Sequence, residues 1–147
     1  MSTLAFSSAG STFSISAGVP ATKDAAGFAA LTYTKIGDVT DLGQIGPSSS
    51  VLLVNPLDDN NTYKLKGSRN NGKIALKMNR APGDPGQTLL IAAEQSTAPY
   101  SAKIVLQTGT ILYFQVLVMS FTTTVGGQNS ITAADADCEV SGVIITV

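Results

Sequence analysis

The feature that most restricts the fold of this chain is a β-type run at residues 110–124 whose two faces are both apolar. Successive side chains of a strand point to opposite faces, so every second residue shares a face. One face carries Leu112, Phe114, Val116 and Val118. A strand that is apolar on both faces must be covered on both. The core can cover one face, and a helix or another subunit must cover the second. We therefore expect an inter-subunit sheet contact at Ile111, Tyr113, Leu117 and Met119.

Similar β-type patterns predict six or seven strands in all. They lie at residues 13–16, 28–36, 51–54, 73–80, 100–107, 110–124 and 138–147. The run at residues 73–80 alternates most cleanly, which is typical of a half-exposed strand. The runs at 100–107 and 110–124 are predicted to form a hairpin that closes at Thr108-Gly109.

A single helix is predicted at residues 84–97. Asp84 occupies the N-cap position, Pro85 follows at the first helical position, and Gln87 completes a capping box. Pro99 ends the helix. One helix among many strands, without regular βαβ alternation, predicts a mainly β fold, either a β-sandwich or a partly closed barrel. Residues 1–147 are expected to form one domain, because domains cluster at about 100–150 residues.

Two segments are predicted to be irregular. Residues 1–22 are rich in small polar side chains, and apart from the short strand they are expected to be an arm that orders only against neighbours. Residues 57–72 are strongly polar, and most of them are expected to form a long exposed loop that ends in an Asn71-Gly72 turn. Tyr63 and Leu65 alternate with Lys64 and Lys66, which suggests a strand in part of this segment.

The composition indicates a partner. Charged residues make up 13% of the chain, against about 25% in an average soluble domain. Such a chain should leave apolar surface that a partner buries. No run approaches the about 18 apolar residues of a membrane span, so membrane insertion is not expected. The net charge of −1 lacks the basic excess of a non-specific nucleic-acid binder. Residues 1–10 lack signal-peptide features, so folding in the cytoplasm of the producing cell is expected.

The residue types exclude most catalytic chemistry. The chain has no histidine and one cysteine, Cys138. Nucleophile–histidine catalysis, His/Cys zinc sites and intramolecular disulfides are therefore excluded. The carboxylate pairs Asp58-Asp59 and Asp135/Asp137 could hold a hard cation, but their pattern favours solvated loop tips. We expect no enzyme activity, no cofactor and no metal site, and partial burial of Cys138.

Six of the nine basic residues lie between residues 64 and 80. This cluster is either a patch for an acidic partner or an exposed face of a loop and strand, and the sequence favours neither. Charges of both signs on the predicted loop could also meet complementary charges on the next subunit, where they would fix register. The candidate inter-ring contacts are Asp58, Asp59, Lys64, Lys66 and Arg69.

Three segments in this order resemble the major tail tube proteins of long-tailed bacteriophages, which are related in fold to type VI secretion tube proteins. The segments are "LTYTKIGDVTDLGQIGPSSSVLLVNPLDD", "GKIALKMNRAPGDPGQTLLIAAEQSTAPY" and "GTILYFQVLVMSFTTTVGGQNSITAADADCEVSGVIITV". They cover about residues 28–147, and none is a catalytic signature.

The resemblance implies a virion protein, assembled in the host cytoplasm, whose hexameric rings stack into a tube. The subunit sheets would join into one β-barrel around a lumen through which viral DNA passes without specific binding. Residues 57–72 would reach the next ring, and residues 1–22 would add contacts. The implied partners are other copies of the chain and the tape measure, tail terminator and distal tail proteins. A further immunoglobulin-like domain of some relatives is not expected here.

Two alternatives stay open at this point. One is a β-sandwich that binds a surface carbohydrate or protein, although the chain has no tryptophan and its aromatics lie mostly inside predicted strands. The other is a tail-terminator or connector ring that does not polymerise.

Overall fold

The computed structural model describes residues 5–147, which form nine strands and two helices. In chain order these are β1 (Thr12–Ser16), α1 (Ala25–Ala29), β2 (Thr34–Lys35), β3 (Val39–Asp41), β4 (Ser48–Val54), β5 (Tyr63–Asn70), β6 (Lys73–Asn79), α2 (Pro85–Gln95), β7 (Tyr100–Val105), β8 (Ile111–Thr124) and β9 (Ala133–Thr146). The fold is mainly β, as the sequence predicts. The first four residues of the N-terminal segment at 1–22, which is predicted to be mostly irregular, lie outside the described residues.

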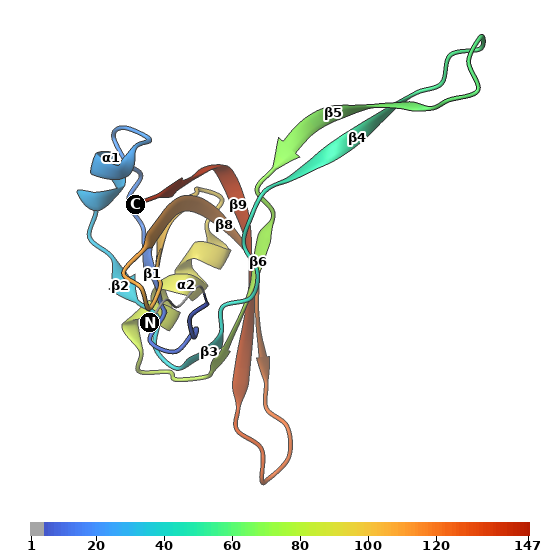
Figure 1. Cartoon of the computed structure of the whole chain (residues 1–147). Helices are drawn as coiled ribbons and strands as arrows, with labels where there is room; N and C mark the ends of the chain where they lie inside the picture. Colours follow the sequence, from blue (N-terminus) through green and yellow to red (C-terminus); the bar gives the residue numbers. More distant parts are fainter. Residues whose placement is uncertain (1–4) are drawn as a thin grey trace.

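Seven antiparallel strands form the main sheet, in the order β2-β1-β7-β8-β9-β6-β3. The sheet curls into a half-barrel, and α2 lies against its concave side (Figure 1). The apolar core fills the space between them. Its largest fully buried apolar side chains are Phe13, Ile15, Ile36, Ile74, Leu76, Met78, Leu90, Phe114 and Val116.

The alternation predicted for residues 73–80 is confirmed. Ile74, Leu76 and Met78 of β6 are buried, and Lys73, Ala75 and Lys77 between them are exposed. This strand pairs with β9 along its whole length. The period-two pattern in the sequence therefore correctly predicted strand β6 and the face of it that is buried.

Helix α2 begins where the sequence predicts it. The carboxylate of Asp84 accepts a hydrogen bond from the Gln87 amide at 2.9 Å, and Leu90 and Ala93 bury the apolar side of the helix. The Gln87 side chain does not close the predicted capping box on Asp84. It is fully buried and bonds instead to the backbone of residues 37, 79 and 81 and to the Arg80 side chain.

The prediction of one strand at residues 28–36 is wrong. Asp24 caps α1 by accepting a hydrogen bond from the Gly27 amide at 2.7 Å, so Phe28 lies in a short helix. Only Thr34 and Lys35 remain in a strand. A capped turn satisfies backbone groups locally, and here that outweighs the β propensity of the residues that follow.

The short strand predicted at residues 13–16 is confirmed as β1. Strand β1 lies inside the main sheet, between β2 and β7, and Phe13 and Ile15 are fully buried. Two large apolar side chains are enough to draw this serine-rich segment into the core.

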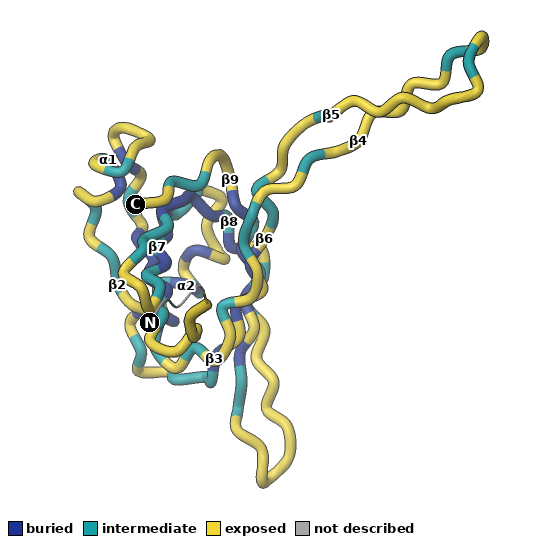
Figure 2. The backbone as a smooth tube through the Cα atoms, in the orientation of Figure 1, coloured by how far each residue is buried: buried dark blue, intermediate teal, exposed yellow. Residues whose placement is uncertain are grey.

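Two hairpins project from the half-barrel (Figure 1). The first is the pair β4–β5, a separate two-stranded sheet that we call the arm (residues 48–70). Half of the predicted loop at 57–72 is therefore a strand, β5, and Asn71-Gly72 joins the arm to β6 rather than closing a hairpin. The second projection is the end of β8–β9, with its loop at residues 125–132. Figure 2 shows that the arm is exposed along nearly all its length.

Candidate assembly interface

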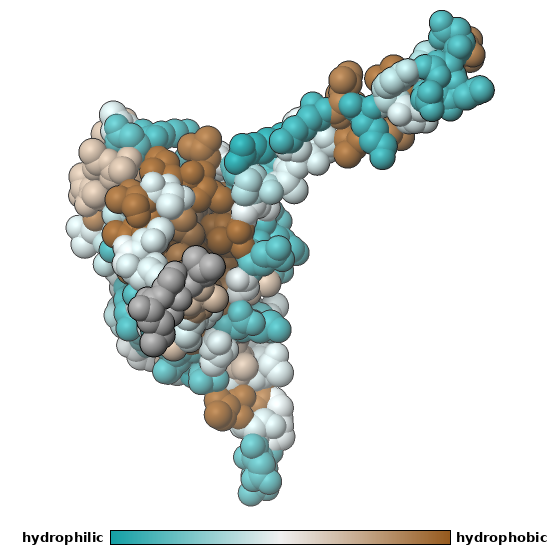
Figure 3. Space-filling view, viewed as in Figure 1, coloured by the Kyte–Doolittle hydropathy of each residue, from teal (hydrophilic) through white to brown (hydrophobic). Residues whose placement is uncertain are grey.

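The arm presents apolar side chains on both faces. Its register places Val54 opposite Tyr63 and Leu52 opposite Leu65, so these four side chains share one face. The other face mixes apolar and basic side chains, Val51 with Lys66 and Leu53 with Lys64. The apolar side chains of both faces are 41–61% exposed, and they form the hydrophobic patches on the arm in Figure 3. An isolated two-stranded ribbon is at best marginally stable in water, so this one is suited to burial against a partner.

The arm tip (residues 55–60) carries one fully exposed apolar side chain, Leu57, and one exposed carboxylate, Asp58. The Leu57 side chain is as exposed as in an unfolded chain, at 106% of the reference area. Asp58 beside it is also exposed. Asp59 serves its own turn instead: it accepts hydrogen bonds from the Asn61 amide at 3.0 Å and from the Tyr63 hydroxyl. These bonds lower the pKa of Asp59 and raise the pKa of Tyr63. Of the two predicted acidic contacts, Asp59 is engaged in its own turn and Asp58 is exposed.

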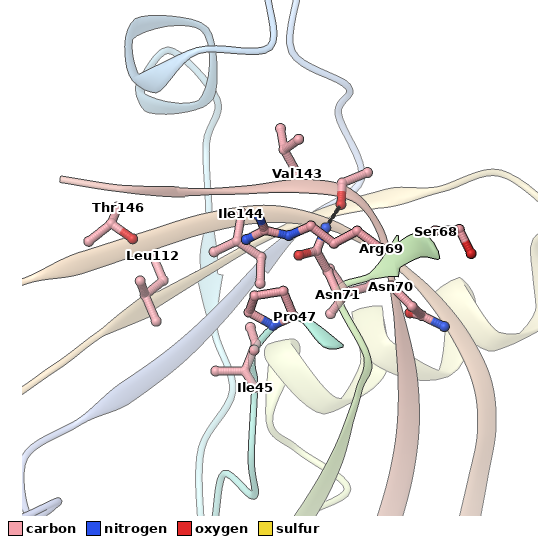
Figure 4. Close-up of a pocket in the computed structure, with 13 residues that line it drawn as sticks. Ile45, Pro47, Ser68, Arg69, Asn70, Asn71, Leu112, Val143, Ile144 and Thr146 are labelled. Atoms are coloured by element: carbon pink, nitrogen blue, oxygen red, sulfur yellow. Dashed lines mark hydrogen bonds between the residues drawn. The ribbon is translucent and has the colours of Figure 1, made fainter. Parts of the chain in front are cut away.

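A groove of about 860 Å³ lies where the arm leaves the half-barrel. We call it the root groove. The Asn71 side-chain amide donates to the Gly142 carbonyl and ties the arm root to β9 beside it. In Figure 4 the Arg69 side chain extends into the groove, which Ile144 also lines. The apolar lining residues are Ile45, Pro47, Leu112, Val140, Val143 and Ile144. The groove can therefore accept an apolar group together with an anion.

The four predicted inter-subunit sheet residues do not share one free face. The Tyr113 side chain is buried because Phe28 of α1 stacks on it at 5.8 Å between ring centroids, and Tyr33 lies 6.2 Å away. Ile111 and Leu117 are half-buried, and Met119 is 61% exposed. Register shifts between Tyr113 and Gln115, and between Val118 and Ser120, interrupt the alternation that the sequence suggested.

Cys138 is fully buried and unpaired, so the expectation of partial burial is wrong. Burial, with a contribution from the charge of Asp137, raises the pKa of this thiol to about 12. Within residues 5–147 no cluster of three or more His, Cys, Asp or Glu side chains is placed to hold a metal ion. None of the helices in this part of the chain has the length and apolar character of a membrane span.

Sequence reasoning missed Leu57 and the root groove. A single apolar residue between Pro56 and Asp58 was a usable signal for the first. The groove joins residues 45–47, 68–71 and 140–146, and only long-range pairing brings these segments together.

A family model described as "Lambda phage tail tube protein, TTP" matches residues 21–143. No curated protein sequence matches the chain. Among solved structures, a chain of the anti-feeding prophage baseplate is similar with a TM-score of 0.73 and 14% identity, over 100% of this chain and 97% of that chain. A chain of the sheath/tube terminator structure of the extracellular contractile injection system PVC is similar with a TM-score of 0.69 and 13% identity, over 99% of this chain and 98% of that chain. The SPP1 tail tube is similar with a TM-score of 0.62 and 13% identity, over 92% of this chain and 75% of that chain. At these identities the solved structures establish the fold.

Proposed function

Because the chain belongs to the lambda phage tail tube protein family and is a structural component of the phage tail, we propose that it assembles into hexameric rings that stack into a tube. In this proposal the arm, which includes most of the predicted inter-ring segment at residues 57–72, joins neighbouring subunits. Lys64, Lys66 and Asp58 face solvent there and remain candidate contacts, whereas Asp59 holds the turn.

The observation that carries this proposal is the uncovered apolar surface of the arm. Of the 14 large apolar side chains that are exposed in residues 5–147, seven lie on the arm: Val51, Leu52, Leu53, Val54, Leu57, Tyr63 and Leu65. The arm projects away from the half-barrel, so its own subunit does not cover these side chains (Figure 1). Contact with another copy removes this apolar area from water.

The proposal also covers the partners of the tube, which are viral DNA and other tail proteins, and the compartment in which the tube assembles. Viral DNA would pass through the lumen without specific binding, which suits a chain with a net charge of −1. Assembly would take place in the host cytoplasm, and the tape measure, tail terminator and distal tail proteins would contact the ends or the lumen of the tube. Leu117 and Met119 lie beyond Val116, the last residue of β8 that pairs with β7, and would contribute to the joined sheet, whereas Ile111 would contribute only its half-buried side chain. We assign the chain no catalytic step.

The test is to shorten the arm. Val51 lies directly opposite Lys66, so residues 52–65 can be replaced by Asn-Gly, which closes a two-residue hairpin between them. We expect the variant to keep the circular dichroism spectrum of the folded subunit but to form no tubes by negative-stain microscopy. Glu94→Gln on the exposed side of α2 is the matched control and should assemble normally. Tubes of normal length from the shortened variant would show that the arm does not join subunits.

A second candidate function is a ring at one end of the tube that does not polymerise. The two structures described as a baseplate and a sheath/tube terminator each match over 97–98% of their chain, whereas the SPP1 tail tube matches over 75%. Purified protein would then form single rings of uniform diameter at every concentration. Tubes that lengthen with protein concentration would exclude this candidate.

A further inference from the structure

We propose that the arm tip of one copy inserts into the root groove of a second copy, with Leu57 in the apolar part of the groove and Asp58 paired with Arg69. This inference rests on the proposed function and adds to it the surface that receives the arm. Its basis is a pair of complementary, uncovered features on the same chain.

The donor is preorganised. The hydrogen bonds from Asn61 and Tyr63 to Asp59 hold the turn, so Leu57 and Asp58 stand at its outer side without a partner in residues 5–147. A turn that is already ordered loses little conformational freedom on binding. Water surrounds the whole Leu57 side chain, and transfer of this side chain to an apolar groove is therefore favourable.

The acceptor matches this donor in shape and charge. The groove of about 860 Å³ has room for the several side chains of a turn. Leu112 and Ile144 are half-buried and line it, and the exposed Val143 stands beside them. The Arg69 side chain lines the same groove as Ile144 (Figure 4), so its guanidinium group shares the groove with apolar side chains. A guanidinium in that position binds a carboxylate most readily when an apolar group excludes water beside it.

The occupant must come from a second copy. Strand β4 is extended from Ser48 to Val54, which is about 20 Å at about 3.3 Å per residue, and the tip lies beyond its end, away from the root of its own arm. The other projection, residues 125–132, is uncharged and offers Arg69 no anion. Donor and acceptor are different surfaces of one chain, so the contact is heterologous. Repetition of such a contact closes a ring or extends a helical assembly.

Disulfide trapping tests the contact. A Leu57→Cys chain is mixed with a Val143→Cys chain under mild oxidation, and the yield of covalent dimer is compared with that from Leu57→Cys and Val125→Cys. Val143 and Val125 are 61% and 66% exposed, so they are matched in accessibility, and Cys138 does not compete because it is buried. We expect the pair at 57 and 143 to form dimer about tenfold faster. Equal rates, or faster trapping at Val125, would overturn the proposed contact.

Charge reversal tests the ion pair. Asp58→Arg and Arg69→Asp should each raise the protein concentration needed for assembly about tenfold, and the double variant should restore it. Asp58→Arg combined with Lys64→Asp is the control and should not restore it. If wild-type protein forms tubes but neither test responds, the contact is wrong and the proposed function stands. If wild-type protein remains monomeric in the presence of other tail components, both the proposed contact and the proposed function are wrong.

Discussion

The amide of Gly37 donates a hydrogen bond of 3.0 Å to the carboxylate of Asp84, 47 residues further along the chain. The same carboxylate oxygen caps α2 through the Gln87 amide. One side chain therefore joins the connection between β2 and β3 to the start of the helix. A side chain at position 37 would meet this carboxylate, because a Cβ built there lies 2.7 Å from Asp84 Oδ1.

Asp84→Ala should destabilise the folded subunit by about 1–2 kcal/mol, because it removes an N-cap and leaves the Gly37 amide without its acceptor. Asp84→Asn keeps an acceptor oxygen in place and should recover most of this loss. Urea unfolding of unassembled subunits, followed by circular dichroism, measures the difference. Equal stability of the alanine variant and the wild type would mean that water replaces the carboxylate at no cost.

Gln87→Leu should destabilise the subunit by about 2–4 kcal/mol, since it leaves several buried groups without partners. The Gln87 side chain donates to the carbonyls of Gly37 and Asn79 at 3.1 and 2.9 Å and accepts from the Ala81 amide at 3.0 Å. Gln95→Leu, at the exposed end of the same helix, is the control and should change stability little. A similar loss for both variants would assign the effect to hydrophobicity rather than to hydrogen bonding.

Stability should fall at high pH through Tyr33. Burial, with a smaller contribution from Tyr113, raises the pKa of Tyr33 to about 12, from an ordinary value of 10.0. The folded state therefore holds the phenolic proton more tightly than the unfolded state. The contribution of Tyr33 is fully present below pH ~10 and is lost as the pH rises towards ~12. Urea unfolding at several pH values should show this slope for the wild type and a shallower slope for Tyr33→Phe, and parallel slopes would contradict it.

Met119 and Tyr113, two members of the predicted inter-subunit set, should respond differently to substitution. Tyr113→Ala removes a ring that stacks on Phe28 and should cost the subunit about 3 kcal/mol of stability. Met119→Ser changes an exposed side chain and should alter the stability of the subunit by less than about 0.5 kcal/mol. If Met119 lies in the interface, this variant should instead raise the concentration needed for assembly. Unchanged assembly would remove Met119 from the interface.

Local patterns predicted the elements whose signals are short-range. The alternation of Ile74, Leu76 and Met78 predicted β6, and the Asp84-Pro85 pair predicted the start of α2. The low charge and the two apolar faces near residue 114 indicated a subunit that needs partners. These features depend on neighbours within a few residues, which a single sequence displays.

Segments whose state depends on distant partners were predicted less well. A short strand was predicted at residues 13–16, but not its place in the main sheet, where Thr12 to Ser16 pair with Val105 to Ser101, about 90 residues away. Residues 63–70 form a strand along their whole length because β4 lies beside them, whereas the sequence suggested a strand only around Tyr63 and Leu65. Tyr113, expected at an interface, is covered because a capped turn brings Phe28 onto it.

The amino-acid sequence by itself determined that this protein is a mainly β subunit with more apolar surface than one copy can cover, and it carried the resemblance to a tail tube family. Only the tertiary structure decided where that surface lies: on a projecting arm with Leu57 at its tip, and in a groove beside Arg69 at its root. The physical reason is that alternation assigns side chains to two faces of a strand, whereas strand pairing and curling of the sheet decide which face the rest of the chain covers.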